Sequence, residues 1–189
     1  MDSIHRPRTA PAGRRAAACS GIASMLTLTL TFGFGFAAHA AAVQPVAEPS
    51  TLTWGETKTY GDGLAVTVAR PTAFTPSATS AGHRAGNQAV AWKVTLKNAT
   101  GEAFETVLVA VYAKYGKAGE QAERVFDAAK GIEGGFEGSV SPGRSATVTY
   151  VFDIPRAGTE MLDLEVVPQV ITHDGTHWVG SLHPRAGRV

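Results

Sequence analysis

Two histidines near the carboxyl-terminal end of the chain are the side chains best suited to hold a metal ion. His173 and His177 enclose Asp174-Gly175, so imidazole and carboxylate groups lie in one short segment. Zinc and copper sites need several such ligands to converge on one point. If Asp174-Gly175 forms a two-residue hairpin turn, Thr172 lies opposite His177 and the two histidines face opposite sides of the sheet. The sequence therefore predicts no shared metal ion, and we expect neither a metal site nor a cofactor.

The sequence contains no motif suited to nucleophilic catalysis. A serine nucleophile of the elbow type needs Gly-x-Ser-x-Gly and a base held nearby. Ser145 follows Gly143, but Thr147 stands where the second glycine would be. Acidic residues that could work as a pair, such as Glu133 and Glu137, are scattered among glycines in the manner of a solvated surface. We therefore expect a protein that is not an enzyme.

Charged residues around one aromatic residue form the most suggestive binding cluster. Residues 123–127 read Glu-Arg-Val-Phe-Asp and precede a glycine-rich loop that ends in Phe136. The cluster suggests an interaction patch of Arg124, Asp127 and Phe136. The more ordinary interpretation is a short covering segment with Phe126 in the core and its charges in water.

The charge distribution argues against a nucleic-acid partner. The whole chain carries a formal net charge of +1, and the first forty residues hold four arginines and one aspartate. Beyond them, 13 basic side chains face 15 acidic ones, and the two kinds alternate along residues 93–130. A protein that follows a phosphate backbone needs clustered lysines and arginines. The chain instead has a mixed, solvated surface.

The first forty residues have the order of a secretory signal. A basic segment precedes an uncharged run from Ala16 to Phe36, and Ala38-His39-Ala40 offers the small residues that signal peptidase accepts. We predict a signal peptide over residues 1–40, with cleavage after residue 40 or 42. The alternative is an uncleaved membrane anchor, because the uncharged run is long enough to span a bilayer. The single cysteine, Cys19, precedes the apolar run, so it does not suit lipidation and leaves the mature domain without a disulfide.

The remainder of the chain is patterned like a set of short strands. We expect a linker over residues 41–51, one domain over 52–183 and a tail over 184–189. In the domain, apolar residues alternate with polar ones, most clearly around Trp92, and Gly, Pro, Asn and Asp separate the segments. Strands are predicted at 64–69, 90–97, 106–115, 147–152, 161–167 and 177–182. One stretch, 119–129, has helical spacing, and 72–88 is expected to be a long exposed loop. The pattern favours an all-β fold, an immunoglobulin-like β-sandwich.

The order of several short motifs resembles that of a known group of proteins. These motifs are Asp62-Gly63-Leu64, the Val94–Asn98 segment, Pro142-Gly143, the Phe152–Pro155 segment and Trp178-Val179-Gly180. Over Trp54 to Leu182 the chain resembles the actinobacterial exported immunoglobulin-like domains of unknown function. This group includes secreted proteins and lipoproteins and is related in fold to a small immunogenic secreted protein of mycobacteria. The resemblance implies a sandwich fold and an extracellular setting, and it supplies no catalytic residues.

Together these patterns suggest a secreted, non-catalytic binding module of the cell surface or medium. A sandwich presents loops from a rigid scaffold, so the site is expected at one end of it. The expected partner is an extracellular or cell-envelope protein or ligand, and a membrane is contacted only through an uncleaved signal segment. The alternatives are an extracellular enzyme with a site assembled from distant residues and a structural cell-envelope protein. A deep pocket with converging acids and histidines would favour the enzyme, and an exposed aromatic patch the binding module.

Overall fold

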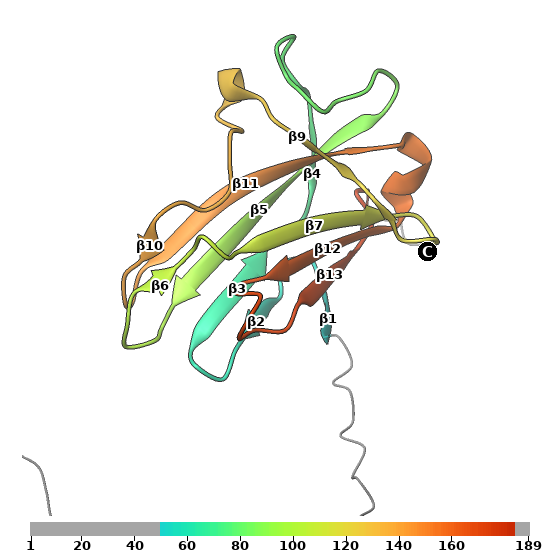
Figure 1. Ribbon diagram of the computed structural model, residues 1–189. Coiled ribbons are helices and arrows are strands. Elements are labelled where there is room, and N and C mark those ends of the chain that lie inside the picture. Colours follow the sequence, from blue (N-terminus) through green and yellow to red (C-terminus); the bar gives the residue numbers. More distant parts are fainter. Residues whose placement is uncertain (1–49, 184–189) are drawn as a thin grey trace, which may run out of the picture. The chain divides into compact units, whose positions relative to one another are not determined.

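The computed structural model describes residues 50–183 as two facing β-sheets (Figure 1). The predicted signal peptide, most of the linker and the tail lie outside the described residues. The first sheet has the order β1 (Ser50–Thr53), β13 (Thr176–Gly180), β12 (Leu162–Val167), β7 (Ala110–Tyr115) and β8 (Glu120–Gln121). The second has the order β2 (Thr57–Thr59), β3 (Leu64–Val68), β5 (Gln88–Asn98), β11 (Ser145–Ile154) and β9 (Glu123–Val125), with β4 (Thr72–Phe74) also paired to β5. A separate pair joins β6 (Phe104–Glu105) to β10 (Ser139–Val140).

The strand order is that of an immunoglobulin-like sandwich. In the second sheet, β3, β5, β11 and β9 follow the order A-B-E-D, and in the first sheet β13, β12 and β7 follow the order G-F-C. β1 runs parallel to β13, whereas the other paired strands are antiparallel. The predicted all-β sandwich is therefore confirmed. Its first strand begins at Ser50, two residues before the expected domain boundary, because β13 offers a free edge with which residues 50–53 pair.

The core lies between the two sheets. Along β5 every second side chain faces inward, and Trp92 is completely buried, with its ring 6.2 Å from that of Trp54 and 5.9 Å from that of Phe152. The opposite sheet contributes Leu164 and Trp178, which are also fully buried. This alternation confirms the inward face predicted for β5. Burial of large apolar side chains holds the two layers together in a domain without cysteine.

The stretch with helical spacing, 119–129, does not form an α-helix. It forms β8 and β9, followed by a single 3-10 turn, η1 (Ala128–Lys130). β9 pairs with the free edge of β11, so that Val125 lies opposite Val151. Backbone donors and acceptors on that edge need partners, and a strand satisfies them where a short helix would not. Val125 is fully buried in a second apolar cluster of the same sheet, with Ala89, Ala91, Ile132 and Val151.

Three other segments differ from expectation. The strand predicted at 106–115 begins only at Ala110, because Thr106–Val109 forms a turn closed by the Val109 N–H and the Thr106 carbonyl, 3.0 Å apart. The strand predicted at 177–182 starts at Thr176 and ends at Gly180. The expected loop 72–88 contains β4 and a bridge from Ala81 to Phe126. Among the described residues, no helix combines the length and apolar character needed to cross a membrane.

The hairpin assumed for Asp174-Gly175 is wrong. The last residue pair before the connection is Val166 with Thr176, so the loop is much longer than two residues. His177 lies opposite Glu165 and not opposite Thr172. Pro168 follows β12 directly, and a proline cannot donate to the next ladder position. The chain then turns so that the N–H groups of Thr172 and His173 both donate to the Gln169 carbonyl.

Candidate functional site

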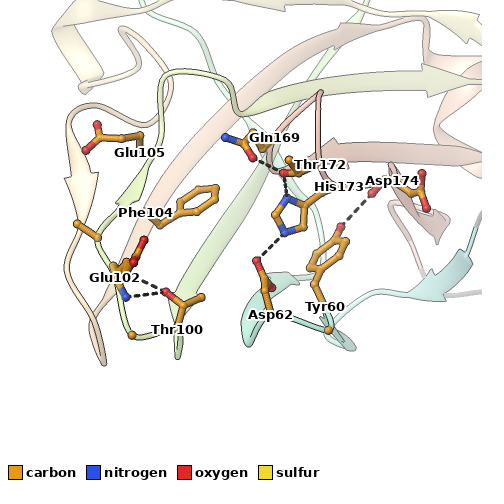
Figure 2. A pocket seen from close by; sticks show the side chains of 13 residues that line it. Tyr60, Asp62, Thr100, Glu102, Phe104, Glu105, Gln169, Thr172, His173 and Asp174 are labelled. Atoms are coloured by element: carbon orange, nitrogen blue, oxygen red, sulfur yellow. Dashed lines mark hydrogen bonds and ion pairs between the residues drawn. The ribbon is translucent and has the colours of Figure 1, made fainter.

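Three loops meet at one end of the sandwich and enclose an open groove (Figure 2). They join β2 to β3, β5 to β6, and β12 to β13. We call this space the loop groove; its volume is about 930 Å³. The lining residues are Tyr60, Gly61, Asp62, residues 100–105, Gln169 and residues 172–174. None of the three loops is adjacent to another in the sequence, so the groove exists only in the folded chain.

His173 lies at the centre of the loop groove. Its side chain is only 8% exposed, and its Nε2 lies 3.0 Å from Asp62 Oδ2, which joins the β12–β13 loop to the β2–β3 loop. The imidazole meets the ring of Tyr60 edge to face at 4.8 Å and that of Phe104 at 6.3 Å. Figure 2 shows the ring between these two aromatic residues and pointing toward Asp62. The β2–β3 loop thus supplies Tyr60 and Asp62 to this cluster, the β12–β13 loop supplies His173, and β6 supplies Phe104.

Both ring nitrogens of His173 have hydrogen-bond partners. Thr172 Oγ1 contacts both Gln169 Oε1 and His173 Nδ1, the latter at 3.0 Å. A carbonyl oxygen only accepts, so the threonine hydroxyl donates to Gln169. The Asp62 carboxylate accepts from Nε2–H, and its charge strengthens this bond.

Local sequence chemistry shapes the loop that carries Asp62. Its Oδ1 accepts from the Leu64 N–H at 3.0 Å, which closes an Asx turn before β3. Gly63 has φ +99°, and a Cβ there would come within 3.0 Å of the Ala99 carbonyl oxygen. The Ala99 N–H donates to the Gly63 carbonyl at 3.2 Å. Glycine therefore allows the β2–β3 loop to pack directly on the β5–β6 loop.

Asn98 is the anchor of the second loop. It is fully buried, and its Nδ2 donates to the carbonyls of Glu102 and Val140, both at 2.7 Å. Its Oδ1 accepts from the Thr100 N–H at 2.9 Å. One amide side chain thus fixes three backbone groups. This network holds Phe104 beside His173.

The environment shifts the pKa of two groups in the groove. Burial raises the pKa of the Tyr60 hydroxyl, and a hydrogen bond with Thr176 acts in the opposite direction. For Asp62, burial acts to raise the pKa, but hydrogen bonds from the Leu64 N–H and from His173 outweigh it and hold the pKa below its ordinary value. Asp62 is therefore ionised over the whole neutral range.

The lining of the loop groove is acidic. It contains Asp62, Glu102, Glu105 and Asp174, with no lysine or arginine among the lining residues. Lys58 lies on β2, and its Nζ is 5.7 Å from the centre of the Tyr60 ring. No lysine or arginine of residues 50–183 forms an ion pair with any of these four carboxylates, and Asp62 bonds His173. The groove therefore presents a negative potential, which attracts a positively charged group.

The arrangement of His173 suits binding better than proton transfer. A general base needs a nitrogen lone pair within reach of the substrate. Both ring nitrogens of His173 are already bonded, to Asp62 and Thr172, and the ring is almost completely buried. The Thr172 hydroxyl donates to Gln169 instead of to the histidine, so it is not activated as a nucleophile. These side chains hold the loops in position.

The three residues of the sequence-predicted patch are only partly brought together. Arg124 and Phe136 line a second pocket, which also contains Tyr150. Asp127 is buried and faces away to Ser77, whose N–H and Oγ lie 2.7 and 2.6 Å from the carboxylate oxygens. Phe126, assigned to the core in the alternative interpretation, is 43% exposed.

The two histidines of the 173–177 segment have separate partners. His173 bonds Asp62, whereas His177 Nδ1 lies 2.8 Å from Asp163 Oδ1. Over residues 50–183, no group of three or more His, Cys, Asp or Glu side chains is arranged to hold a metal ion. Neither carboxylate contact is predicted from the sequence, because the assumed hairpin places both histidines at a tight turn.

Sequence reasoning missed most of the groove. The sequence alone identifies neither Tyr60 nor Phe104 as a site residue, and it identifies Asp62 only as part of a turn. The Asp-Gly turn before β3 and the Asn-x-Thr turn after β5 are the local signals that could have located two of the loops. Nothing local indicates that these turns meet His173.

Comparison with known proteins gives the fold and no family. No family model matches the chain, and no curated protein matches it either. The yjhA protein of Bacillus subtilis is similar in structure, with a TM-score of 0.55 and 14% identity over 67% of this chain and 97% of that one. A putative lipoprotein, ycdA of Bacillus subtilis subsp. subtilis str. 168, has a TM-score of 0.55 and 10% identity over 68% of this chain and 39% of that one. The secreted protein MPT63 of Mycobacterium tuberculosis has a TM-score of 0.48 and 17% identity over 70% of this chain and 98% of that one.

Identities this low relate folds only. The actinobacterial group that the sequence resembles therefore stays a prediction. The chain is a β-sandwich protein with an acidic groove at its loop end.

Proposed function

We propose that this protein is an exported, non-catalytic binding module whose loop groove takes a positively charged ligand. The observation that carries the proposal is the lining of the groove, in which four carboxylates and no lysine or arginine surround a partly buried aromatic cluster. Opposite charge across an interface steers association and selects the partner. A ligand with an amine or guanidinium group, such as a basic peptide segment of an extracellular protein, fits this chemistry.

The position of the groove on the sandwich supports a binding role. The β5–β6 and β12–β13 loops occupy the places of the B–C and F–G loops of an immunoglobulin-like sandwich, which lie at one end of the fold. Loops there can vary without disturbing the core. The exported location rests on the signal-like order of residues 1–40.

An enzyme is the second candidate, because Asp62 and His173 do converge in a groove. Its chemistry would be proton transfer by His173. Against it stand the burial of the ring and its bonds to Asp62 and Thr172, which leave neither nitrogen open to a substrate. A hydrolytic activity that His173→Gln abolishes while leaving cation binding intact would favour the enzyme over the binding module.

The proposal is tested by titrating the mature domain with trilysine and, separately, with triglutamate while following the backbone amide signals by NMR. We expect trilysine to shift the signals of residues 60–63, 100–105 and 169–174, and triglutamate to leave them in place. The double variant Glu102→Gln/Asp174→Asn should bind trilysine about three- to tenfold more weakly, because each exposed pair contributes only a fraction of 1 kcal/mol to about 1 kcal/mol.

The matched control is Glu133→Gln/Glu160→Gln, which removes the same charge from exposed positions outside the groove lining. It should bind trilysine as the parent does. Equal weakening in both double variants would mean that net charge alone attracts the peptide, and the groove would not be the binding site.

A further inference from the structure

Arg124 lies at the open edge of the sandwich with its side chain between the layers. It belongs to the edge strand β9, where Val125 points to the outer face of the sheet and Arg124 to the inner face. Its guanidinium carbon lies 5.2 Å from the centre of the Phe126 ring and 4.6 Å from that of Tyr150. These rings displace water from the faces of the cation.

The Arg124 guanidinium has fewer partners than its burial demands. Nη2 donates to the Gly134 carbonyl, but Nε is buried and has no hydrogen-bond partner within the described chain. No carboxylate of residues 50–183 forms an ion pair with it, in contrast to Arg84, which lies 2.7 Å from Glu123. Burial lowers the pKa of Arg124, and only the nearby Tyr150 opposes that shift. A half-buried cation without a counter-ion is unfavourable unless an anion joins it.

A pocket opens directly onto this cation. Its volume is about 370 Å³, and its walls are Arg124, Gly135, Phe136, Tyr150 and the Thr106–Tyr112 segment. The Tyr150 hydroxyl accepts from the Phe136 N–H, and no acceptor for its own proton is found among residues 50–183. A Cβ at Gly135 would come within 3.0 Å of this hydroxyl oxygen, so the glycine keeps the space beside it open. Arg124 and Tyr150 therefore both lie at one small pocket, and one of the two carries a positive charge.

We infer that this pocket, the Arg124 pocket, binds a carboxylate group, with Arg124 as its counter-ion and the Tyr150 hydroxyl as a second donor. A planar carboxylate matches the planar fork of an arginine. A phosphate group usually meets several cations, and Arg124 is the single basic residue in the lining. The volume suits one acidic side chain or a small organic acid. This site lies apart from the loop groove and does not depend on the function proposed for it.

Acetate is the probe for this inference. The mature domain is titrated with sodium acetate at constant ionic strength, and the Arg124 side-chain N–H and the Gly135 amide are followed by NMR. We expect both signals to shift and to saturate in the millimolar range, while sodium chloride and sodium phosphate have little effect. No saturation, or stronger binding of phosphate than of acetate, would overturn the inference.

Three variants separate binding from a merely structural role of the arginine. Arg124→Gln should abolish the saturable shift at Gly135, and the control Arg84→Gln should leave it unchanged. Tyr150→Phe keeps the ring under the guanidinium and removes only the hydroxyl, so acetate should bind about tenfold more weakly. If Arg124→Gln fails to fold, Tyr150→Phe decides alone, and an affinity equal to that of the parent overturns the inference. An arginine that only covers the Tyr150 ring predicts no response to acetate in any variant.

Discussion

Buried acids determine how the long segment 75–88 lies on the sandwich. Asp153 in β11 is almost completely buried and contacts His83 Nδ1 at 2.7 Å and Asn87 Nδ2 at 2.6 Å. Asp127 holds the start of the same segment through Ser77. A buried carboxylate is tolerated only when donors surround it. A segment expected to be an exposed loop is therefore tied to the domain at both of its ends.

The hydrogen bonds to Asp127 predict a dependence of stability on pH. The side-chain and backbone hydrogen bonds from Ser77 hold the pKa of Asp127 below its ordinary value. A carboxyl group whose pKa is lower in the folded than in the unfolded chain stabilises the fold at pH values above its unfolded pKa of about 3.9. This contribution is lost as the pH falls through the pKa of the folded state. We expect the free energy of unfolding, measured in urea, to decrease from about pH 6 to about pH 2. The decrease should be smaller in Asp127→Asn.

The comparison variant for this measurement is Glu133→Gln, at an exposed position. Its unfolding free energy should follow that of the parent over the same pH range. An equal acid dependence in the parent and in Asp127→Asn would show that Asp127 does not contribute to it.

At the scale of elements, the edge strand β9 is held from both sides. β11 pairs with one of its edges, and the bridge between Ala81 and Phe126 extends its other side through reciprocal N–H to carbonyl bonds of 2.8 and 3.0 Å. Gly82 follows this bridge with φ +82°, and a Cβ there would collide with the Arg124 carbonyl oxygen. The close approach of two backbones thus depends on a glycine.

Two glycines of the same loop allow this contact to be measured. Gly86 has φ +91°, but a Cβ there would meet nothing within 4 Å. Gly86→Ala should therefore cost about 1–2 kcal/mol from the left-handed backbone alone. Gly82→Ala carries the same backbone cost and the collision, and we expect it to cost about 1–3 kcal/mol more in chemical denaturation. Equal losses for the two variants would mean that the segment moves away from β9 at no cost.

At the scale of the whole molecule, the domain has apolar clusters on both faces of its second sheet. The larger one fills the space between the sheets around Trp92 and Trp178, and the smaller one surrounds Val125 on the outer face, with Phe74 packed against it. The single cysteine of the chain precedes the domain, at position 19. Apolar packing on both faces of the sheet stabilises this domain, whereas a disulfide contributes to the stability of many exported sandwiches.

Export is tested on the intact protein in its own culture medium. Mass measurement should find an amino terminus at Ala41 or Val43, because the residues before them have the order of a cleavable signal. Recovery of the chain in a membrane fraction with residues 1–40 attached would instead identify an uncleaved anchor.

The sequence by itself determined the all-β class and the inward face of the main strands. Side chains alternate across a strand with a period of two, so the pattern around Trp92 already identifies what is buried. Turn residues act locally as well, and the turns at Asp62-Gly63 and Pro142-Gly143 could be recognised from a few letters.

Only the tertiary structure decided the partners of the edges and the loops. Residues 119–129 became strands because the free edge of β11 needed backbone partners, a demand that no local pattern contains. Asp62 and His173 are 111 residues apart, and they meet because three strands end at the same end of the sandwich. Within residues 50–183, Arg124 has no counter-ion for the same kind of reason, since its surroundings come from β7, β11 and the 134–136 loop. Periodicity is a local property, whereas a site is made by contacts between distant segments, and the packing of the two sheets selects those contacts.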